Sequence, residues 1–452
     1  MSDALQPALP PALPAAPLPA LPAARPPAPS SPQDEARARG LRFRRRTFIG
    51  ASVLFLLFAL RYRNVVIDDP WITFRHGRNL AEGLGLAFNP GQAPVEGYSN
   101  PLWMLLSAGA HVVGMDPLSA ARVVAVACAL LVVGILSGLL GGRRRDELGR
   151  PLGFSPAGAW ALAAMPAFGV STMNGMETTS HALLFLLAVL WSAQAAARPG
   201  RWTGLGLGAV LLAGCLSRPE GPMILAAPAA AWAVATPRGR RALLVGVGVA
   251  GAGFIAFLVH RFSTFGALMP NTVTAKVGGS PLESLWAGIV YTFAFFGGSP
   301  ALLAGLAVVM VARVLPRRWA SDRWSARDRA LALAAGALIA LQVVFVLGVG
   351  GDWMPGWRFW VPVLPLLALL AGRIMDGFPF FVRFVLVGFL ILASPFEASL
   401  ETIQGYRTLE WGRVQSRGEL LVEPLFRVGR DVRAIVPEDA TIALTEVGVI
   451  PC

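Results

Sequence analysis

Two adjacent carboxylates, Asp68 and Asp69, follow the first apolar segment of the chain. A carboxylate held beside its twin near apolar walls is suited to take a proton from a hydroxyl group, as a general base does. Paired carboxylates can also hold a divalent cation that neutralises a phosphate. A structural role is equally open, because Asp69 before Pro70 is a good N-cap for the helix that follows. Both roles are also compatible, with Asp69 as the cap and Asp68 facing the site. The pair therefore predicts a catalytic base, a divalent-cation site or a helix cap.

Basic side chains follow the acidic pair on the same predicted helix. Arg75, His76 and Arg78 come about two turns later, where two guanidinium groups could bind a phosphate or complete an ion-pair network. A solvated helix face is the structural alternative. Lys276 is the single lysine of a chain that otherwise uses arginine, and a compact ammonium suits an oxygen of a phosphate or sugar. These cations predict a phosphate-bearing substrate.

Acidic side chains recur in three later polar segments. Glu177, and Glu220 beside Arg218, lie where apolar segments begin, and an ion pair at the membrane interface is their structural alternative. Asp352 is followed by tryptophans and by Arg358. Aromatic rings beside polar groups can form a platform for a sugar face, although tryptophan is also common at the membrane interface. These segments extend the predicted site to sugar binding.

Long apolar blocks separate these polar segments and must position them. The chain has 452 residues, of which 55% are hydrophobic and 14% charged, whereas an average soluble domain has about 25% charged residues. Blocks of about 20 apolar residues match the thickness of the hydrocarbon core of a bilayer. The composition excludes a disordered protein and predicts an α-helical polytopic membrane protein. We expect eleven spans, at about residues 47–61, 118–141, 154–172, 179–197, 203–217, 220–236, 242–259, 299–314, 330–349, 358–372 and 378–396.

The distribution of charge decides the topology. The formal net charge is +13, but arginine clusters between the apolar blocks account for it, which is typical of cytoplasmic loops and not of a nucleic-acid-binding surface. All clusters fall on the cytoplasmic side if the N-terminus is cytoplasmic and two short apolar segments, Pro101–Met115 and Leu285–Gly297, are interfacial helices. The polar candidate residues then lie outside. Cys128, Cys215 and Cys452 have no spacing typical of a metal site or a disulfide framework.

Three regions are expected from this pattern. Residues 1–46 are Pro/Ala-rich and predict an extended, disordered cytoplasmic tail. Residues 47–396 form the transmembrane domain, with a first external loop at 62–117. Residues 397–452 form an extracytoplasmic C-terminal segment.

The polar segments resemble a known family. The first loop, from Asp68-Asp69-Pro-Trp-Ile-Thr-Phe-Arg75 to Glu96-Gly-Tyr98-Ser-Asn100-Pro-Leu-Trp103, is similar to that of bacterial GT-C glycosyltransferases, and above all to the terminal arabinofuranosyltransferases of mycobacterial cell-wall synthesis. Gly175-Met-Glu177-Thr, Arg218-Pro-Glu220-Gly, Pro270-Asn271-Thr and Gly350-Gly-Asp352 recur in the same order. The resemblance covers residues 45–452, and its first-loop motif is the most specific part.

The resemblance implies a GT-C-like bundle in the bacterial cytoplasmic membrane, with a C-terminal α/β segment that is incomplete here. It implies an inverting transfer of a sugar, such as arabinofuranose, from a polyprenyl-phosphate donor to an envelope glycan or lipid acceptor on the extracytoplasmic face. Asp68 or Asp69 would be the catalytic base. Substrate-binding roles are implied for Arg75, His76, Arg78, Glu96, Tyr98, Asn100, Glu177, Arg218, Glu220, Asn271, Lys276, Asp352 and Arg358.

Two other functions fit the pattern less well. One is a non-enzymatic relative of the same family that acts in flagellar motor control. The other is a transporter of lipid-linked sugars, which should show inverted repeats and polar groups at membrane depth. The polar groups of this chain cluster at one face, and no internal repeat is evident.

Overall fold

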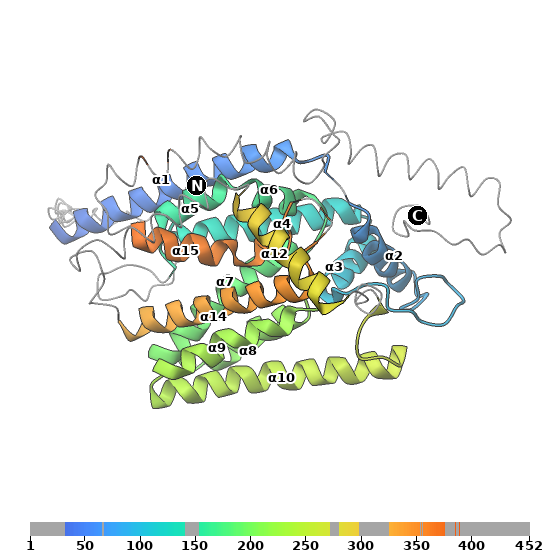
Figure 1. The fold of residues 1–452 in the computed structure, drawn as a ribbon. Coiled ribbons are helices and arrows are strands. Elements are labelled where there is room, and N and C mark those ends of the chain that lie inside the picture. The colour runs from blue at the N-terminus through green and yellow to red at the C-terminus, as the bar shows by residue number, and fades with distance from the viewer. Residues whose placement is uncertain are drawn as a thin grey trace, which may run out of the picture. The chain divides into compact units, whose positions relative to one another are not determined.

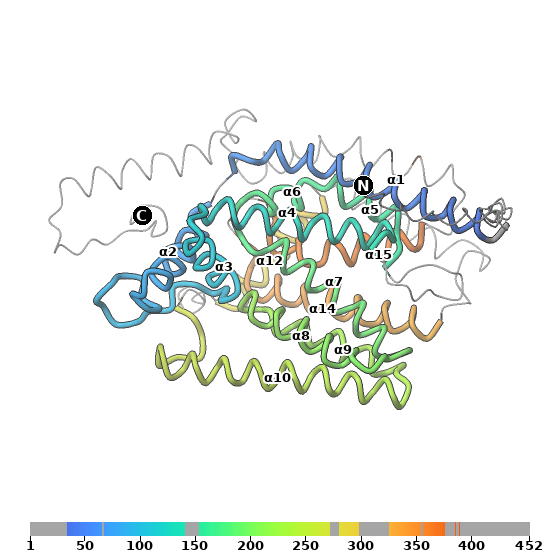
Figure 2. Tube along the Cα trace, turned by 180° about the vertical axis from the view of Figure 1, so that it is seen from behind, coloured from blue at the N-terminus to red at the C-terminus, as the bar shows by residue number. Residues whose placement is uncertain are grey.

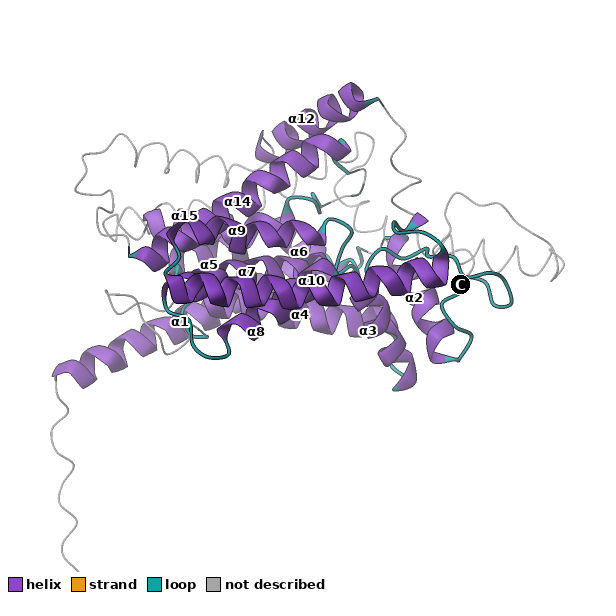
Figure 3. Cartoon of the chain, turned by 90° about the horizontal axis from the view of Figure 1, so that it is seen from below, coloured by secondary structure: helices purple, strands orange, loops and turns teal. Residues whose placement is uncertain are grey.

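The described residues of the chain fold into helices (Figure 1). The computed structural model describes residues 32–65, 67–140, 153–271, 280–297, 325–352 and 356–375, with Met354, Val385 and Gly388. By internal contacts the chain divides into Met1–Arg42 and Phe43–Cys452. Within the described residues every regular element is a helix (Figure 3). The predicted span at 299–314, nearly all of the span at 378–396 and the predicted C-terminal α/β segment lie outside them.

Helix α1 (Pro32–Arg61) contains the predicted first span and begins before it. It therefore includes residues that the sequence analysis assigned to the extended tail. Proline is tolerated in the first turn of a helix, and the acidic residues of that turn, Asp34 and Glu35, interact favourably with the helix dipole. The following alanines and arginines are good helix formers.

Four helices of the described residues are long and apolar enough to cross a membrane. They are α4 (Pro117–Leu136), α7 (Thr178–Ala197), α10 (Pro237–Phe265) and α14 (Ala326–Val349). Each matches a span expected from the apolar blocks. The chain is thus a multi-pass membrane protein whose described elements are helices, as predicted for its transmembrane domain.

Other predicted spans are shorter or broken. The span expected at 154–172 is divided into α5 (Pro156–Ala163) and α6 (Pro166–Met173), because the residue before a proline is forced toward extended backbone and Met165 has φ −78° and ψ 119°. The predicted spans at 203–217, 220–236 and 358–372 likewise consist of short helices. These are α8 (Thr203–Cys215), η1 (Gly221–Leu225), α9 (Ala226–Ala231), η2 (Trp232–Val234), η3 (Val361–Val363) and α15 (Leu364–Met375).

Three helices do not match predicted spans. Helix α2 (Asp69–Ala81) and helix α3 (Pro101–Val112) belong to the first loop, and α3 has 12 residues, too few for an upright crossing. Helix α12 (Pro281–Gly297) begins earlier than the interfacial helix expected there. A capping box explains this start, since Glu283 N donates to Ser280 Oγ at 3.2 Å and Ser280 N to Glu283 Oε2 at 3.4 Å.

Helix α7 occupies the centre of the bundle (Figure 2). It contacts α4, α8, α9, α10 and α14, and its apolar side chains belong to the main hydrophobic core. Small residues allow close helix approach beside it. A Cβ on Gly204 or Gly208 of α8 would lie 2.9 Å or 2.7 Å from a valine of α10, as expected of small-residue packing in membranes.

The arginine-rich helix ends share one end of the bundle (Figure 1). Thr236, before α10, donates from Oγ1 to Ala196 O near the end of α7, at 3.2 Å. Arg373 near the end of α15 pairs with Asp328 at the start of α14. Helices α2 and α3 lie at the opposite end. Among the described residues, these arginine-bearing helix ends are therefore separated from the first loop, whereas the clusters at 143–150 and 313–324 lie outside the described residues.

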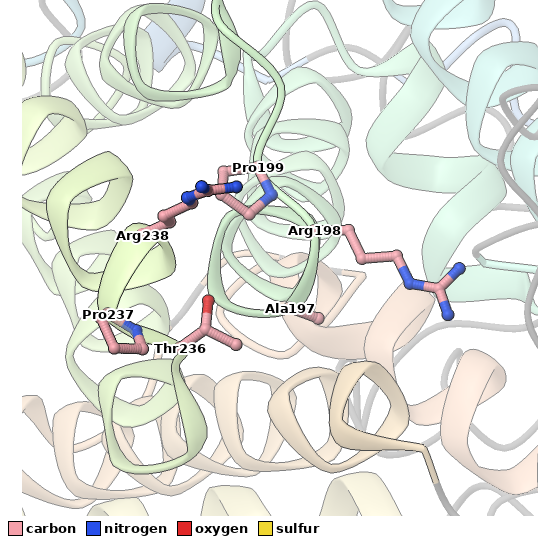
Figure 4. A pocket seen from close by; sticks show the side chains of 6 residues that line it. All are labelled: Ala197, Arg198, Pro199, Thr236, Pro237 and Arg238. Atoms are coloured by element: carbon pink, nitrogen blue, oxygen red, sulfur yellow. The ribbon is translucent and has the colours of Figure 1, made fainter.

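A hollow of about 480 Å³ lies at the arginine-rich end, between the end of α7 and the start of α10. Figure 4 shows Arg238 beside Pro199, with Arg198 directed away from them. Its lining residues are Ala197, Arg198, Pro199, Thr236, Pro237 and Arg238. None of them is a predicted site residue, so the hollow does not mark the candidate active site.

Candidate active site

The acidic pair lies at the start of α2. Asp68 is the N-cap residue and Asp69 is the first residue of the helix, and no side-chain hydrogen bond caps it. The expectation that Asp69 caps the helix is therefore wrong, because Asp68 already has helical angles, with φ −71° and ψ −41°. The Asp69 side chain, 25% exposed, carries its negative charge in the first turn, where the helix dipole favours it.

Arg358 brings two of the predicted acidic residues together. Its Nη1 lies 3.6 Å from Asp69 Oδ2, and its Nε pairs with Asp352 Oδ2. Nη2 also donates to Asp352 Oδ1, at 3.4 Å. Arg358 is 6% exposed, and its Nη1 donates to Met176 Sδ at 3.3 Å. Segments far apart in the sequence thus meet at one buried guanidinium.

The backbone around Arg358 is unusual. Gly350, Gly351 and Gly356 have φ values of 81°, 85° and 90°, and Trp357 has a φ of 53°. A bulky residue rarely adopts such a conformation, which costs about 1–3 kcal/mol and is often found at functional sites. The Trp357 ring packs 5.0 Å from that of Tyr291, which holds the strained residue in place.

A second buried network joins the first loop to the central helix. Asn100 Nδ2 donates to Glu177 Oε2 at 2.5 Å, and Arg218 Nη1 donates to Glu177 Oε1 at 2.8 Å. Arg218 Nε also pairs with Glu220 Oε1 at 2.5 Å. Thr73 of α2 donates to Asn100 Oδ1 at 3.0 Å. All five side chains are buried, so this network fits the structural alternative of an interface ion pair, here extended to the first loop.

Arg75 and His76 stabilise the first loop itself. Arg75 Nε donates to Phe88 O at 2.8 Å, and Nη2 donates to Asn89 Oδ1 at 3.0 Å. His76 is fully buried and accepts a hydrogen bond from Gly97 N at 3.3 Å. The His76 ring packs 4.9 Å from that of Tyr98, edge to face. These contacts favour a structural role for the three residues.

The charge state of His76 follows from its surroundings. Burial, and secondly the nearby Arg75, lower the pKa of His76 to about 4. The imidazole is therefore neutral at neutral pH, which agrees with Nε2 acting as an acceptor. A neutral, buried ring does not supply positive charge to a phosphate.

Glu96 connects the last part of the first loop to helix α10. Its Oε2 lies 3.0 Å from Arg261 Nε near the end of α10. Arg261 Nη1 also donates to Leu268 O at 3.1 Å. Burial raises the pKa of Glu96, while Arg261 opposes that shift. Arg261 and Thr73 were not predicted as site residues from the sequence. Arg261 lies close to an apolar run, and this position could have marked it as a candidate.

Arg78, Asn271 and Lys276 complete the set of predicted site residues, and a tryptophan near Arg358 was also considered for sugar binding. Arg78 is partly buried on α2, and its Nε has no hydrogen-bond partner among the described residues. Asn271 is exposed, and Lys276 lies outside the described residues. Trp360 is buried against Phe295, so it does not form a sugar platform. Within the described part of the chain, no three His, Cys, Asp or Glu side chains are placed to hold a metal ion.

Comparison with known sequences finds a curated bacterial relative. The chain is 27% identical over 354 residues to a terminal β-(1→2)-arabinofuranosyltransferase of Corynebacterium glutamicum. The alignment covers 72% of this chain and 50% of that protein, so the chain spans about half the length of the curated relative it matches. No family model matches the chain.

Solved structures share the fold. Crystal structures of ArnT from Cupriavidus metallidurans match with a TM-score of 0.53 for the form bound to undecaprenyl phosphate and 0.52 for the apo form. The first is 18% identical and covers 86% of this chain and 71% of that one. The second is 17% identical and covers 85% and 70%. The predicted resemblance is confirmed: this chain has the helical fold of the ArnT structures and is similar in sequence to a terminal arabinofuranosyltransferase.

Proposed function

We propose that the protein is a membrane glycosyltransferase that transfers a sugar from a polyprenyl-phosphate donor to an envelope glycan or lipid acceptor. The observation that carries this proposal is Asp69, a partly exposed carboxylate at the start of α2, placed beside Arg358. The similar arabinofuranosyltransferase supports the reaction class and suggests a pentofuranose such as arabinofuranose. The ArnT structure with undecaprenyl phosphate supports a polyprenyl-phosphate donor.

The reaction needs one proton acceptor. A carboxylate of the Asp68–Asp69 pair takes the proton of the acceptor hydroxyl, and that oxygen forms a bond to the anomeric carbon of the donor. The bond from the anomeric carbon to the phosphate oxygen breaks on the opposite face, which inverts the configuration. The electron pair leaves with the polyprenyl phosphate, whose negative charge is stable without a general acid.

The leaving phosphate needs positive charge nearby. Arg75, Arg218 and Arg358 already contact first-loop groups or carboxylates. Arg78 is the better candidate of the two arginines of α2, because its Nε has no hydrogen-bond partner among the described residues. Lys276 is a second candidate, from its sequence alone.

The lipid tail of the donor has an apolar surface available. Helix α3 and the turn after it expose Leu105, Val112, Val113 and Met115. An exposed apolar face at the end of a membrane bundle suits contact with acyl or polyprenyl chains. The tail would lie along α3 and bring the phosphate toward α2, which packs against α3.

The sidedness rests on the arginine clusters. The described clusters lie at the end of the bundle opposite the first loop, and the positive-inside rule assigns such clusters to the cytoplasm. The active site is then extracytoplasmic. A cysteine introduced at the exposed first-loop position Ala93 should react with a membrane-impermeant maleimide in intact cells, and one at the exposed Arg238 should react only after lysis.

Paired amide substitutions test the catalytic assignment. We expect Asp69→Asn to abolish sugar transfer and Asp68→Asn to reduce it less, with both variants folding normally. The measurement is mass spectrometry of envelope glycans and polyprenyl-phosphate sugars in a deletion strain complemented with each variant. Accumulation of one lipid-linked sugar in the deletion strain would name the donor.

The same experiment separates the alternatives. Full complementation by both Asn variants and by the double variant would exclude the proposed base. A deletion that changes motility and leaves every glycan unchanged would favour flagellar motor control. A lipid-linked sugar that accumulates on the cytoplasmic leaflet alone would favour a transporter.

A further inference from the structure

We infer that Arg358 is a positioning residue that holds Asp69 as the catalytic base, and that Asp352 acts through Arg358. The inference rests on the proposed function and deepens it, because it selects Asp69 from the acidic pair. It also replaces the substrate-binding roles that the sequence suggested for Arg358 and Asp352.

The first step is the division of the guanidinium between two carboxylates. Asp352 forms an ion pair with Nε through Oδ2 and accepts a hydrogen bond from Nη2 through Oδ1. Asp69 Oδ2 lies 3.6 Å from Nη1. A rigid, planar fork held along one side by a carboxylate has its other edge fixed in direction. Asp352 thus fixes where the Nη1 edge points, and Nη1 lies beside Asp69.

The second step is electrostatic. Asp352, with a side chain 3% exposed, balances most of the charge of Arg358 at close range. Asp69 lies beyond hydrogen-bonding length from Nη1. Arg358 therefore orients the Asp69 carboxylate without the close pairing that would prevent it from accepting a proton.

The third step is the rigidity of the supporting segment. Strained backbone at Trp357 immediately precedes Arg358. A Cβ on Gly351 would lie 2.6 Å from Tyr291 Cγ, so this turn packs tightly against α12. Trp360 stacks on Phe295 at 5.5 Å with an interplanar angle of 4°. A preorganised site requires that packed neighbours hold each residue in place, and these contacts hold the segment that carries Arg358.

The fourth step concerns access. Arg358 is buried under Met176 and Phe359, whereas Asp69 is partly exposed. A substrate can therefore reach Asp69 more readily than the guanidinium. Burial of this kind favours a positioning role over direct phosphate binding.

The chain offers a matched control for the test. Arg373 and Asp328 form another Arg–Asp pair of low exposure, between α15 and α14 at the arginine-rich end. Arg373→Lys changes the same chemistry far from the candidate base. It should lower the thermal unfolding midpoint and leave the kinetic constants unchanged.

The experiment measures the kinetics of the full chain in lipid nanodiscs. Undecaprenyl-phosphate-linked arabinofuranose is the donor probe, and an octyl arabinofuranoside is the acceptor. Arg358→Lys should lower kcat by about 100-fold, the size of effect that a small misplacement of a catalytic group causes, with KM for the donor changed less than threefold. Asp352→Asn should act in the same direction, and it serves if the lysine variant does not fold.

Each outcome is decisive. A raised donor KM with unchanged kcat in Arg358→Lys would mean direct donor binding and overturn the inference. Unchanged kinetics in Arg358→Lys and Asp352→Asn would overturn it as well. A deletion strain with unchanged envelope glycans and polyprenyl-phosphate sugars would overturn the proposed function and this inference together, whereas an active wild type confines the failure to Arg358.

Discussion

Arg261 and Glu96 form a buried ion pair, with 3.0 Å between Nε and Oε2. The pair joins the end of α10 to the last part of the first loop. Removal of one partner from such a pair leaves an uncompensated buried charge, whereas removal of both does not. The pair therefore sets up a test of how the loop is held.

We expect Arg261→Met to lower the free energy of unfolding by about 3–5 kcal/mol, because Glu96 then keeps a buried charge without its partner. The double variant Arg261→Met with Glu96→Gln should recover at least half of that loss. The measurement is chemical unfolding in detergent micelles, followed by tryptophan fluorescence. Equal losses in the single and double variants would contradict the ion-pair account.

His76 predicts a pH dependence of stability. Its pKa is about 4 in the folded protein against an ordinary value of 6.5, so the unfolded chain binds more protons between these values. The stabilising contribution is complete above pH 6.5 and is lost as pH falls toward 4, a loss on the order of 3 kcal/mol from this residue. Thermal unfolding midpoints from pH 7.5 to pH 4.5 should fall accordingly, and His76→Gln, which keeps an acceptor for Gly97 N, should reduce the slope. Identical slopes would exclude His76 as the cause.

Trp357 predicts a backbone effect that can be separated from its ring contacts. Trp357→Ala and Trp357→Gly both remove the ring, but only glycine adopts φ 53° without steric cost. The glycine variant should therefore be more stable than the alanine variant by about 1 kcal/mol. Calorimetric unfolding of both variants gives the comparison, and an alanine variant of equal or greater stability would argue against strain at this position.

The sequence predicted the fold through its composition. Blocks such as those of α4 and α14 are apolar over a bilayer thickness, and this pattern needs no tertiary information. The interruption before Pro166 was missed, although the rule that a proline disfavours helix at the preceding residue was available. The start of α1 at Pro32 was missed because the proline-rich composition of the tail outweighed its acidic first turn.

The sequence indicated candidate residues for the site, but it did not predict which of them pair with each other. Arg218 and Glu220 are neighbours in sequence, so their pair could be expected, but Glu177 joins them only through the fold. Nothing local indicates that Arg358 lies between Asp69 and Asp352. Charge patterns show which side of the membrane a group occupies, whereas pairing depends on how the helices pack.

The hydrogen bond from Asn100 to Glu177 and the ion pair from Glu96 to Arg261 also bear on biosynthesis. Chains leave the ribosome from the N-terminus, so the first loop emerges well before α7 and α10. These two connections can form only once those later helices have been inserted. The segment that carries the candidate base is thus synthesised early and reaches its final structure late.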